Sequence, residues 1–175
     1  PTSDAVYTPS RFISLANTLG EVPVATAALG PVAGLPASRL VASHFSVMTE
    51  SSLVLIAGPK VVKRALNIDV TKEALGGPEV HLKSGVINNI AKTEDDAFEQ
   101  IKTFLSFVPD NAWAFPDYIA TNDKEDRCDD LLIDIIPKDR RRPYNVRKII
   151  TSLLDINDDQ STFFEIGKKY GPSLV

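Results

Sequence analysis

The chain has 175 residues, of which 43% are hydrophobic and 24% are charged, and its formal net charge is −4. This size and composition suit one globular domain, or parts of two, with enough apolar residues to bury a core. The mildly acidic balance gives no support for general nucleic-acid binding, and no apolar run approaches the roughly 20 residues that span a bilayer. The single cysteine, Cys128, excludes a disulfide within the chain and a zinc site of several cysteines. We therefore expect no nucleic-acid partner, no membrane partner and no metal site.

The first hundred residues predict short strands that alternate with helices. A helix is expected from Thr8-Pro9, with apolar residues at helical spacing up to a stop at Gly20. Strands are expected at 22–28, 45–48 and 53–57, and short helices after Gly58 and at 71–75. The clearest helix is predicted at 93–108, with Thr93 as its N-cap and three acidic residues in its first turn. This alternation predicts an α/β fold with parallel strand pairing.

The rest of the chain predicts a linker and a second organised segment. Residues 110–126 lack periodicity and carry polar and proline residues, so an extended connection is expected there. The run "LLIDII" at 131–136 predicts a strand that ends at Pro137, and Pro143 is expected to open a helix with apolar residues up to Leu154. The tail "STFFEIGKKYGPSLV" begins a further element.

The usual catalytic motifs are missing from the sequence. There is no G-x-S-x-G elbow, no phosphate-binding P-loop and no G-x-G-x-x-G fingerprint. His44 and His81 lie far apart in the sequence without a metal-like partner, which favours packed or surface roles for both. The acidic pairs Asp95-Asp96 and Asp158-Asp159 stand in helix-start or turn contexts and favour solvated faces.

The stretch "LGPVAGLPAS", residues 29–38, directly follows a predicted apolar strand. Its two glycines would allow close approach of a ligand to the backbone, whereas Pro36 removes one backbone donor. From these residues alone, both a binding loop and a tight corner remain open.

Four segments then follow one another in order: "LGPVAG", "IAGPKVVK", "EALGGPEVHLKSGV" and, after the linker, "IIPKDRRRPYNVRKII" with "FFE". Together, in this order, they resemble the carboxyltransferase β subunits of biotin-dependent acyl-CoA carboxylases, as in propionyl-CoA carboxylase. The resemblance runs from about Phe12 to Phe164. It implies a crotonase-like (ClpP/crotonase) α/β fold, with an incomplete first domain and the start of a second, related domain.

The resemblance also implies chemistry that needs no titrating side chain. In this family CO2 passes from carboxybiotin to an acyl-CoA through an enolate-like species and a ureido oxyanion, and backbone N–H groups stabilise the developing charges. It implies acyl-CoA as the substrate, here a short-chain one, and biotin carried by a partner protein or domain. A biotin carboxylase or biotin carrier subunit and further copies of the full-length chain are the implied protein partners.

Carried over by position, the resemblance assigns the backbone donors of the oxyanion site to Gly34 and Leu35. Leu35 stands where the family has a second glycine, and Pro36 stands where it usually has alanine. A donor pair at 34 and 35 would be intact, whereas a pair at 35 and 36 would lack one donor, at a cost of about 10²–10³ in rate. The matching positions that could contact cofactor or substrate are Gly30, Ala33, Gly58, Pro59, Gly76, Gly77 and Gly85.

For several of these positions, a role in the fold is an alternative to contact with a ligand. The glycine turns from Gly58 onwards are expected mainly to hold the fold around the pocket, as is His81, which also matches a family position. The basic run 138–142 has arginines suited to CoA phosphates, but a solvated turn before the Pro143 helix is favoured.

The resemblance covers only part of a longer family protein. It predicts residues 1–109 as the C-terminal part of the N-terminal carboxyltransferase domain, 110–126 as a linker and 127–175 as the start of the C-terminal domain. A fragment that is inactive alone is therefore expected, rather than a short relative.

Two other functions remain open beside carboxyl transfer. Pro36 and the short chain motivate a catalytically silent, carboxyltransferase-like assembly or interaction protein. Decarboxylation of an acyl-CoA would use the same oxyanion chemistry in reverse. The expected location is the mitochondrial matrix if the source is eukaryotic, and otherwise the cytoplasm.

Overall fold

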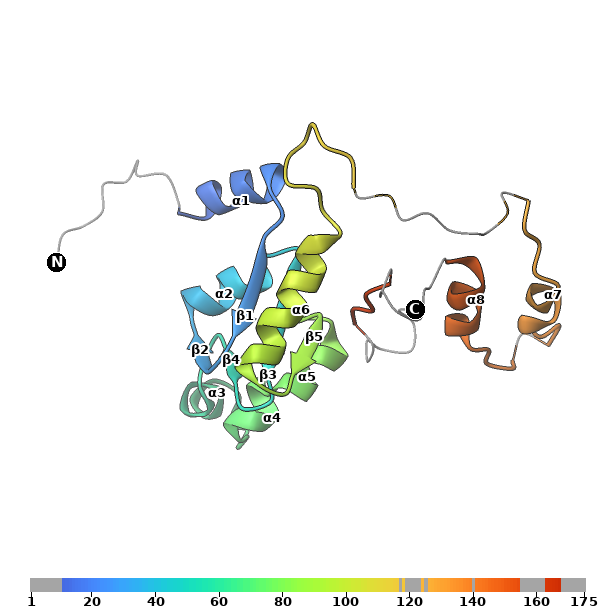
Figure 1. The fold of residues 1–175 in the computed structure, drawn as a ribbon. Coiled ribbons are helices and arrows are strands. Elements are labelled where there is room, and N and C mark those ends of the chain that lie inside the picture. The colour runs from blue at the N-terminus through green and yellow to red at the C-terminus, as the bar shows by residue number, and fades with distance from the viewer. Residues whose placement is uncertain are drawn as a thin grey trace.

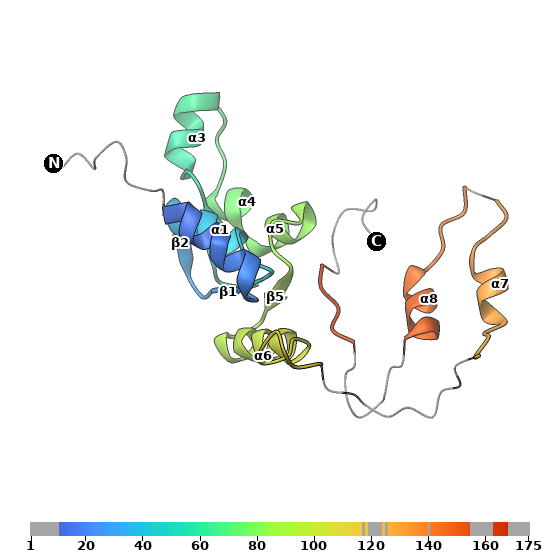
Figure 2. The same cartoon turned by 90° about the horizontal axis from the view of Figure 1, so that it is seen from above.

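The computed structural model describes residues 11–116, 118, 124, 126–139, 141–154 and 163–167. In this part of the chain, helices pack around two small parallel sheets, and two further helices, α7 and α8, lie apart from the sheets (Figure 1, Figure 2). The predicted α/β class and the predicted parallel pairing are both confirmed. We call residues 11–109 the first unit and residues 127–167 the second segment.

The larger sheet has three parallel strands in the order β1 (Ala25–Ala28), β3 (Phe45–Thr49) and β5 (Asn89–Ala91). All five residues of β3 are buried, as is typical of a central parallel strand that is covered on both faces. β1 and β3 fall within or beside the predicted strands. β5 was not predicted, because three residues are too few to show a strand pattern in the sequence.

The smaller sheet pairs β2 (Pro31–Ala33) with β4 (Leu53–Leu55), again in parallel, with Ala33 opposite Leu55. β2 lies inside the stretch 29–38, and helix α2 (Leu35–Val41) begins there too. The stretch is therefore a strand, a one-residue corner at Gly34 and the first turn of a helix. Pro36 fits that first turn, where a backbone N–H has no partner within the helix.

The remaining helices of the first unit mostly begin at residues that are typical helix-start signals in the sequence. Thr71 caps the helix predicted at 71–75, and its Oγ1 accepts a hydrogen bond from the Ala74 amide at 3.1 Å. The helix after Gly77 was not predicted, although Pro78 at its first position is a recognised start signal. Thr8 and Pro9 lie outside the described residues. These helices are α1 (Arg11–Glu21), α3 (Pro59–Leu66), α4 (Lys72–Gly76), α5 (Pro78–Ser84) and α6 (Glu94–Ser106).

Helix α6 confirms the cap predicted for it. Thr93 Oγ1 accepts a hydrogen bond from the Asp96 amide at 3.1 Å, and Asp96 Oδ2 accepts one from the Lys92 amide at 2.8 Å. The hydrogen bonds from the Lys92 amide and the Gln100 side chain hold the pKa of Asp96 below its usual range. The helix ends at Ser106, two residues before the predicted end.

Two hydrophobic clusters form the core. The first lies between the sheets and helices α2 and α5, and consists of Ala28, Ala37, Leu40, Met48, Val54, Leu82 and Ile87. The second lies under α6 and consists of Phe45, Val47, Ala91 and Ala97.

The second segment corrects one prediction. Residues 131–136 were expected to form a strand, and instead Leu131–Ile135 forms the short helix α7. Asp129 Oδ1 accepts a hydrogen bond from the Leu131 amide at 2.9 Å, which turns the chain locally, and no described strand lies alongside to pair with it. Helix α8 (Val146–Leu153) begins after Asn145, whose Oδ1 accepts from the Arg147 amide at 3.0 Å, rather than at Pro143.

The described residues within 110–126, between the first unit and the second segment, are exposed and form no helix or strand. The division into 1–109, 110–126 and 127–175 stays a prediction. Of the tail, only 163–167 is described, and Asp158-Asp159 lie outside the described residues. Among the described helices, none has the length and apolar character needed to cross a membrane.

Candidate functional site

The corner between β2 and α2 consists of one residue, Gly34. Its φ of 68° and ψ of −132° belong to a region that residues with a side chain avoid. A Cβ added there would meet no atom within 4 Å. The backbone conformation therefore requires glycine, while the space beside the corner is open.

The amides of this corner are not equally available. The Gly34 amide, expected to be one of two oxyanion donors, donates to the Leu55 carbonyl oxygen at 2.9 Å and so extends the pairing of β2 with β4. Pro36 has no N–H. Within the described part of the chain, no hydrogen bond uses the Leu35 or Ala37 amide. The sequence offered two donor pairs, residues 34 with 35 and residues 35 with 36. In each pair, only the Leu35 amide remains as a backbone donor that makes no hydrogen bond with a described residue.

Ala37 was not singled out from the sequence. Its amide belongs to the first turn of α2, and amides in a first turn have no acceptor within the helix. Pro36 was the available signal, because proline near a helix start predicts that the neighbouring amides lie in this first turn.

Two further predicted residues lie around Leu55, the last residue of β4. Ala33 pairs with Leu55 across the small sheet. Gly76, at the end of α4, is buried against β4: a Cβ there would lie 2.3 Å from Leu55 Cδ2 and 2.3 Å from the Val54 carbonyl oxygen. The fold thus brings Ala33, Gly34 and Gly76 together, and Gly76 is required for close packing.

The other predicted glycines have identifiable roles in the backbone. Gly58 and Pro59 start α3 shortly after β4 ends. Gly77 joins α4 to α5, and a Cβ there would lie 2.6 Å from the Glu73 carbonyl oxygen. Gly85 ends α5 in the left-handed conformation, with φ 73°. Gly30 lies at the other end of β2 from the corner, where its carbonyl oxygen accepts from the Leu53 amide at 3.4 Å.

The side chains of both histidines form hydrogen bonds with backbone atoms of the first unit. His44 Nδ1 accepts a hydrogen bond from the Val24 amide at 3.0 Å. His81 Nε2 lies 2.7 Å from the Val54 carbonyl oxygen, so this nitrogen carries the proton. These contacts agree with the expected packed or surface roles: His44 is exposed, and His81 is partly buried against β4.

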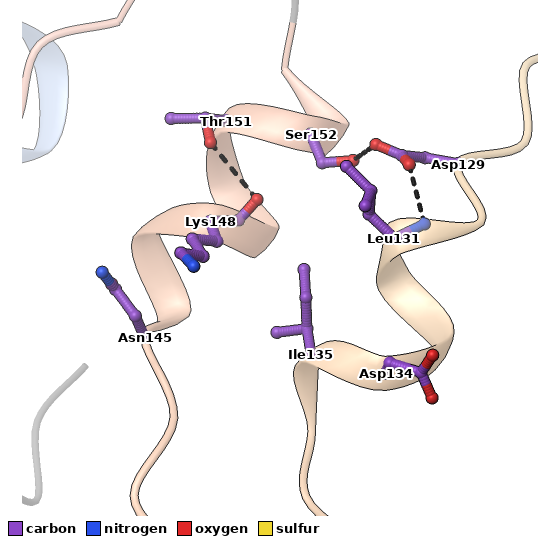
Figure 3. Close-up of a pocket in the computed structure, with 8 residues that line it drawn as sticks. All are labelled: Asp129, Leu131, Asp134, Ile135, Asn145, Lys148, Thr151 and Ser152. Atoms are coloured by element: carbon purple, nitrogen blue, oxygen red, sulfur yellow. Dashed lines mark hydrogen bonds between the residues drawn. The ribbon is translucent and has the colours of Figure 1, made fainter.

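The second segment has a pocket of about 660 Å³ between α7 and α8 (Figure 3). Hydrogen bonds from Ser152 Oγ and the Leu131 amide hold the pKa of Asp129, on its rim, below the usual range. None of the predicted site residues lines this pocket. Its lining consists of Asp129, Leu131, Asp134, Ile135, Asn145, Lys148, Thr151 and Ser152.

The basic run 138–142 forms an exposed turn where it is described. Asp139 accepts hydrogen bonds from two backbone amides at 3.0 Å, that of Arg141 through Oδ1 and that of Arg142 through its carbonyl oxygen. These contacts favour the solvated turn. Among the described residues, no group of three or more His, Cys, Asp or Glu side chains could hold a metal ion.

Comparisons with known proteins agree with this fold. The biotin-dependent acetyl-/propionyl-coenzyme A carboxylase beta5 subunit of Mycobacterium leprae is 32% identical over 165 residues, which cover 89% of this chain and 29% of the relative. The mitochondrial propionyl-CoA carboxylase beta chain of Mus musculus is 30% identical over 166 residues, which cover 94% of this chain and 30% of the relative.

A solved structure extends the likeness to three dimensions. The transcarboxylase 12S hexamer structure with hydrolysed methylmalonyl-coenzyme A bound matches with a TM-score of 0.76 and 32% identity, over 91% of this chain and 31% of the solved chain. The chain thus spans less than a third of the length of these proteins, and its fold is that of a crotonase-like carboxyltransferase. The family model for the carboxyl transferase domain matches residues 10–175. With sequence, fold and segment order in agreement, the chain belongs to the carboxyl transferase domain family.

Proposed function

We propose that this chain is part of an acyl-CoA carboxyltransferase and contributes one oxyanion-binding corner to its active site. The reaction transfers CO2 from carboxybiotin to a short-chain acyl-CoA. The observation that carries the proposal is the open corner at Gly34, beside which the Leu35 amide is free. A chain of the carboxyl transferase domain family with this corner has the backbone donor that the chemistry needs.

The proposed mechanism depends on the backbone. Carboxybiotin, when bound, would supply CO2, and its ureido group, left with negative charge on its oxygen, would accept the α-proton of the acyl-CoA. Loss of that proton leaves an enolate with negative charge on the thioester oxygen, and this charge is neutralised when the α-carbon attacks CO2. The Leu35 N–H is fixed in the first turn of α2 and donates to one of these oxygens, with the Ala37 amide as a second candidate. Because Gly34 has no side chain, the ligand can approach the corner closely.

The other predicted positions take supporting roles in this proposal. Ala33 and Gly34 border the ligand, and Gly58 and Pro59 follow β4 next to the corner. Gly76 and Gly77 hold α4 and α5 against β4, which keeps Leu55 in place as the acceptor for Gly34. Gly30 and Gly85 shape turns of the fold.

The proposal extends to the complete protein. Residues 1–109 and 127–175 belong to two related domains, and the active site is completed by the second domain of another copy. The name of the Mycobacterium leprae relative, which calls that protein biotin-dependent, supports the use of biotin, and we propose that biotin arrives on a carrier protein or domain. The hexamer named for the solved relative supports a homo-oligomer. The mitochondrial relative from mouse supports a mitochondrial location in a eukaryote, for which we propose the matrix.

One observation favours a second candidate, a catalytically silent assembly protein. Pro36 has no N–H and the Gly34 amide is engaged, so the corner offers fewer donors than the sequence resemblance implies. A full-length protein that binds its partners without carboxyl-transfer activity would support this alternative.

The test compares two variants of the full-length protein, Leu35→Pro and Leu35→Ala. Both shorten the side chain, but only proline removes the amide donor, and proline is well tolerated at the first position of a helix. We expect acyl-CoA-dependent carboxyl transfer to fall by about 10²–10³ in kcat for Leu35→Pro relative to Leu35→Ala. Equal activity of the two folded variants, with thermal unfolding as the control, would contradict the role of the Leu35 amide.

A further inference from the structure

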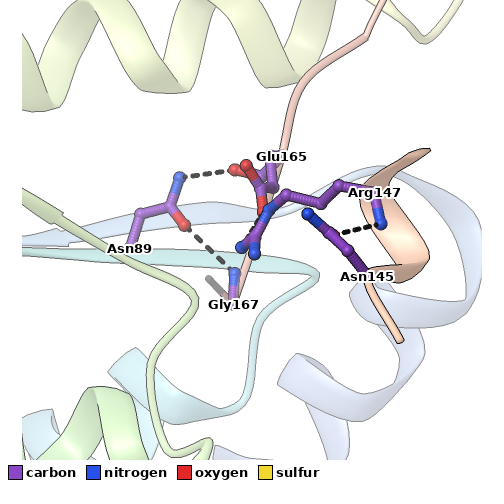
Figure 4. Close-up of polar contacts among 5 residues, drawn as sticks. All are labelled: Asn89, Asn145, Arg147, Glu165 and Gly167. Atoms are coloured by element: carbon purple, nitrogen blue, oxygen red, sulfur yellow. Dashed lines mark hydrogen bonds and ion pairs between the residues drawn. The ribbon is translucent and has the colours of Figure 1, made fainter. Parts of the chain in front are cut away.

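Residues 163–167 lie against the edge of β5, although more than fifty residues separate them from the end of α6 (Figure 4). The carboxamide of Asn89 contacts this segment with both of its polar atoms. Nδ2 donates to the Glu165 carbonyl oxygen at 3.3 Å, and Oδ1 accepts from the Gly167 amide at 3.2 Å. The side chain therefore pairs with the C=O of one residue and the N–H of the second residue along, as a neighbouring strand would.

The backbone of β5 and its approach reinforces this contact. The Gly167 amide also donates to the Asn88 carbonyl oxygen at 2.8 Å, so it is shared between two acceptors. Gly167 has a φ of 68°, a conformation that glycine adopts without strain. Gly167 thus meets the edge of the sheet in a backbone conformation that a larger residue would disfavour.

An aromatic side chain anchors the same segment in the core. Phe164 packs against the second hydrophobic cluster, with its ring edge-on to Phe45 at a centroid distance of 5.5 Å. Phe45 is fully buried and stacks with Phe104 of α6 at 5.1 Å. A residue of the second segment therefore completes an aromatic group of the first unit, a typical anchor for an interface.

A third contact connects this segment to α8. Arg147, near the start of the helix, reaches Glu165 through two donors: Nε lies 2.8 Å and Nη2 lies 2.5 Å from Glu165 Oε1. The Glu165 side chain is 25% exposed, whereas that of Arg147 is 58% exposed. The pair therefore orients α8 relative to the docked segment rather than supplying most of the binding energy.

We infer that the edge of β5 and the Phe45–Phe104 pair form a docking surface for residues 164–167, and that this surface holds the second segment on the first unit independently of the covalent linker. The bound element has a phenylalanine anchor, a backbone C=O and N–H that hydrogen-bond to the Asn89 side chain, and a glycine with a positive φ at the sheet edge. Neither the family assignment nor the proposed carboxyl transfer requires this surface.

The test uses the full chain with a specific protease site inserted between residues 118 and 124. After complete cleavage, we expect the two pieces to stay associated in gel filtration at about 10 μM, because the docked contacts do not depend on the linker. Phe164→Ala should weaken their association about tenfold or more through the loss of the buried ring. Phe115→Ala is the matched control, since Phe115 is 93% exposed and should leave the association unchanged.

A second, nearly isosteric variant keeps the test decisive if Phe164→Ala fails to fold. Asn89→Asp retains the acceptor for Gly167 but replaces the donor to the Glu165 carbonyl with a carboxylate oxygen, so association should again fall by about tenfold. Asn67→Asp, at the exposed end of α3, is its control. Separation of the wild-type pieces after cleavage, or unchanged association in Asn89→Asp, would overturn the docking surface.

Discussion

Gly34 and Gly76 both contact the end of β4 at Leu55, and they are glycine for opposite reasons. Gly34 adopts a positive φ with open space around the position of a Cβ, and its amide binds the Leu55 carbonyl oxygen. At Gly76, a Cβ would overlap both Leu55 Cδ2 and the Val54 carbonyl oxygen. Gly34 leaves open space beside the small sheet, whereas Gly76 lets helix α4 pack directly against β4.

The difference separates ligand positions from packing positions among residues that look alike in the sequence. A thioester can approach a glycine corner only where no protein atom already occupies the space. Gly34 meets this condition and Gly76 does not. We therefore place the proposed ligand at the β2–α2 corner and assign Gly76 to the support of β4.

The largest effect on stability is expected for Gly76→Ala. The new methyl group would meet a backbone oxygen that cannot move without disturbing β4, so we expect the free energy of unfolding to fall by about 3 kcal/mol or more. Chemical denaturation of the full-length protein measures this change.

Gly58→Ala is the matched control for Gly76→Ala. Gly58 has a φ of −79°, and a Cβ there meets no atom within 4 Å. We expect a change within about 0.5 kcal/mol. Similar losses in both variants would show that the contact with Val54 and Leu55 does not explain Gly76.

A smaller effect on stability is expected for Gly34→Ala. Its cost comes from the backbone conformation alone, about 1–3 kcal/mol, because the methyl group has room. The same methyl group would project into the space proposed for the ligand, so the KM for acyl-CoA should rise while the protein stays folded. A stability loss as large as that of Gly76→Ala, or an unchanged KM, would remove the distinction between the two glycines.

The sequence predicts the first unit better than the second segment. Local patterns predict the α6 cap at Thr93, the buried strand β3 and the helix that follows Gly58, because each is governed by residues within a few positions. The run at 131–136 has the apolar composition of a strand, yet a strand needs a neighbour, and Asp129 instead favours one turn of helix. When the strand that would pair with a segment lies far along the chain, the segment's own sequence does not show whether that partner is present.

The same limit applies to the candidate site. The stretch 29–38 and the loss of a donor at Pro36 could be recognised from the sequence, and both matter in the structure. The engagement of the Gly34 amide depends on Leu55, 21 positions away in the small parallel sheet, so it could not be predicted locally. This one contact removes the Gly34 amide from the expected donor pair and leaves that of Leu35.

The most direct test is a crystal structure of the full-length protein with an acyl-CoA and biotin bound. Our proposal predicts the thioester oxygen or the biotin ureido oxygen at about 3 Å from the Leu35 nitrogen, with the Gly34 amide still bound to Leu55 and no ligand atom in contact with Gly76. Both ligands bound with these oxygens beyond hydrogen-bonding distance of Leu35 would contradict the oxyanion role of the corner.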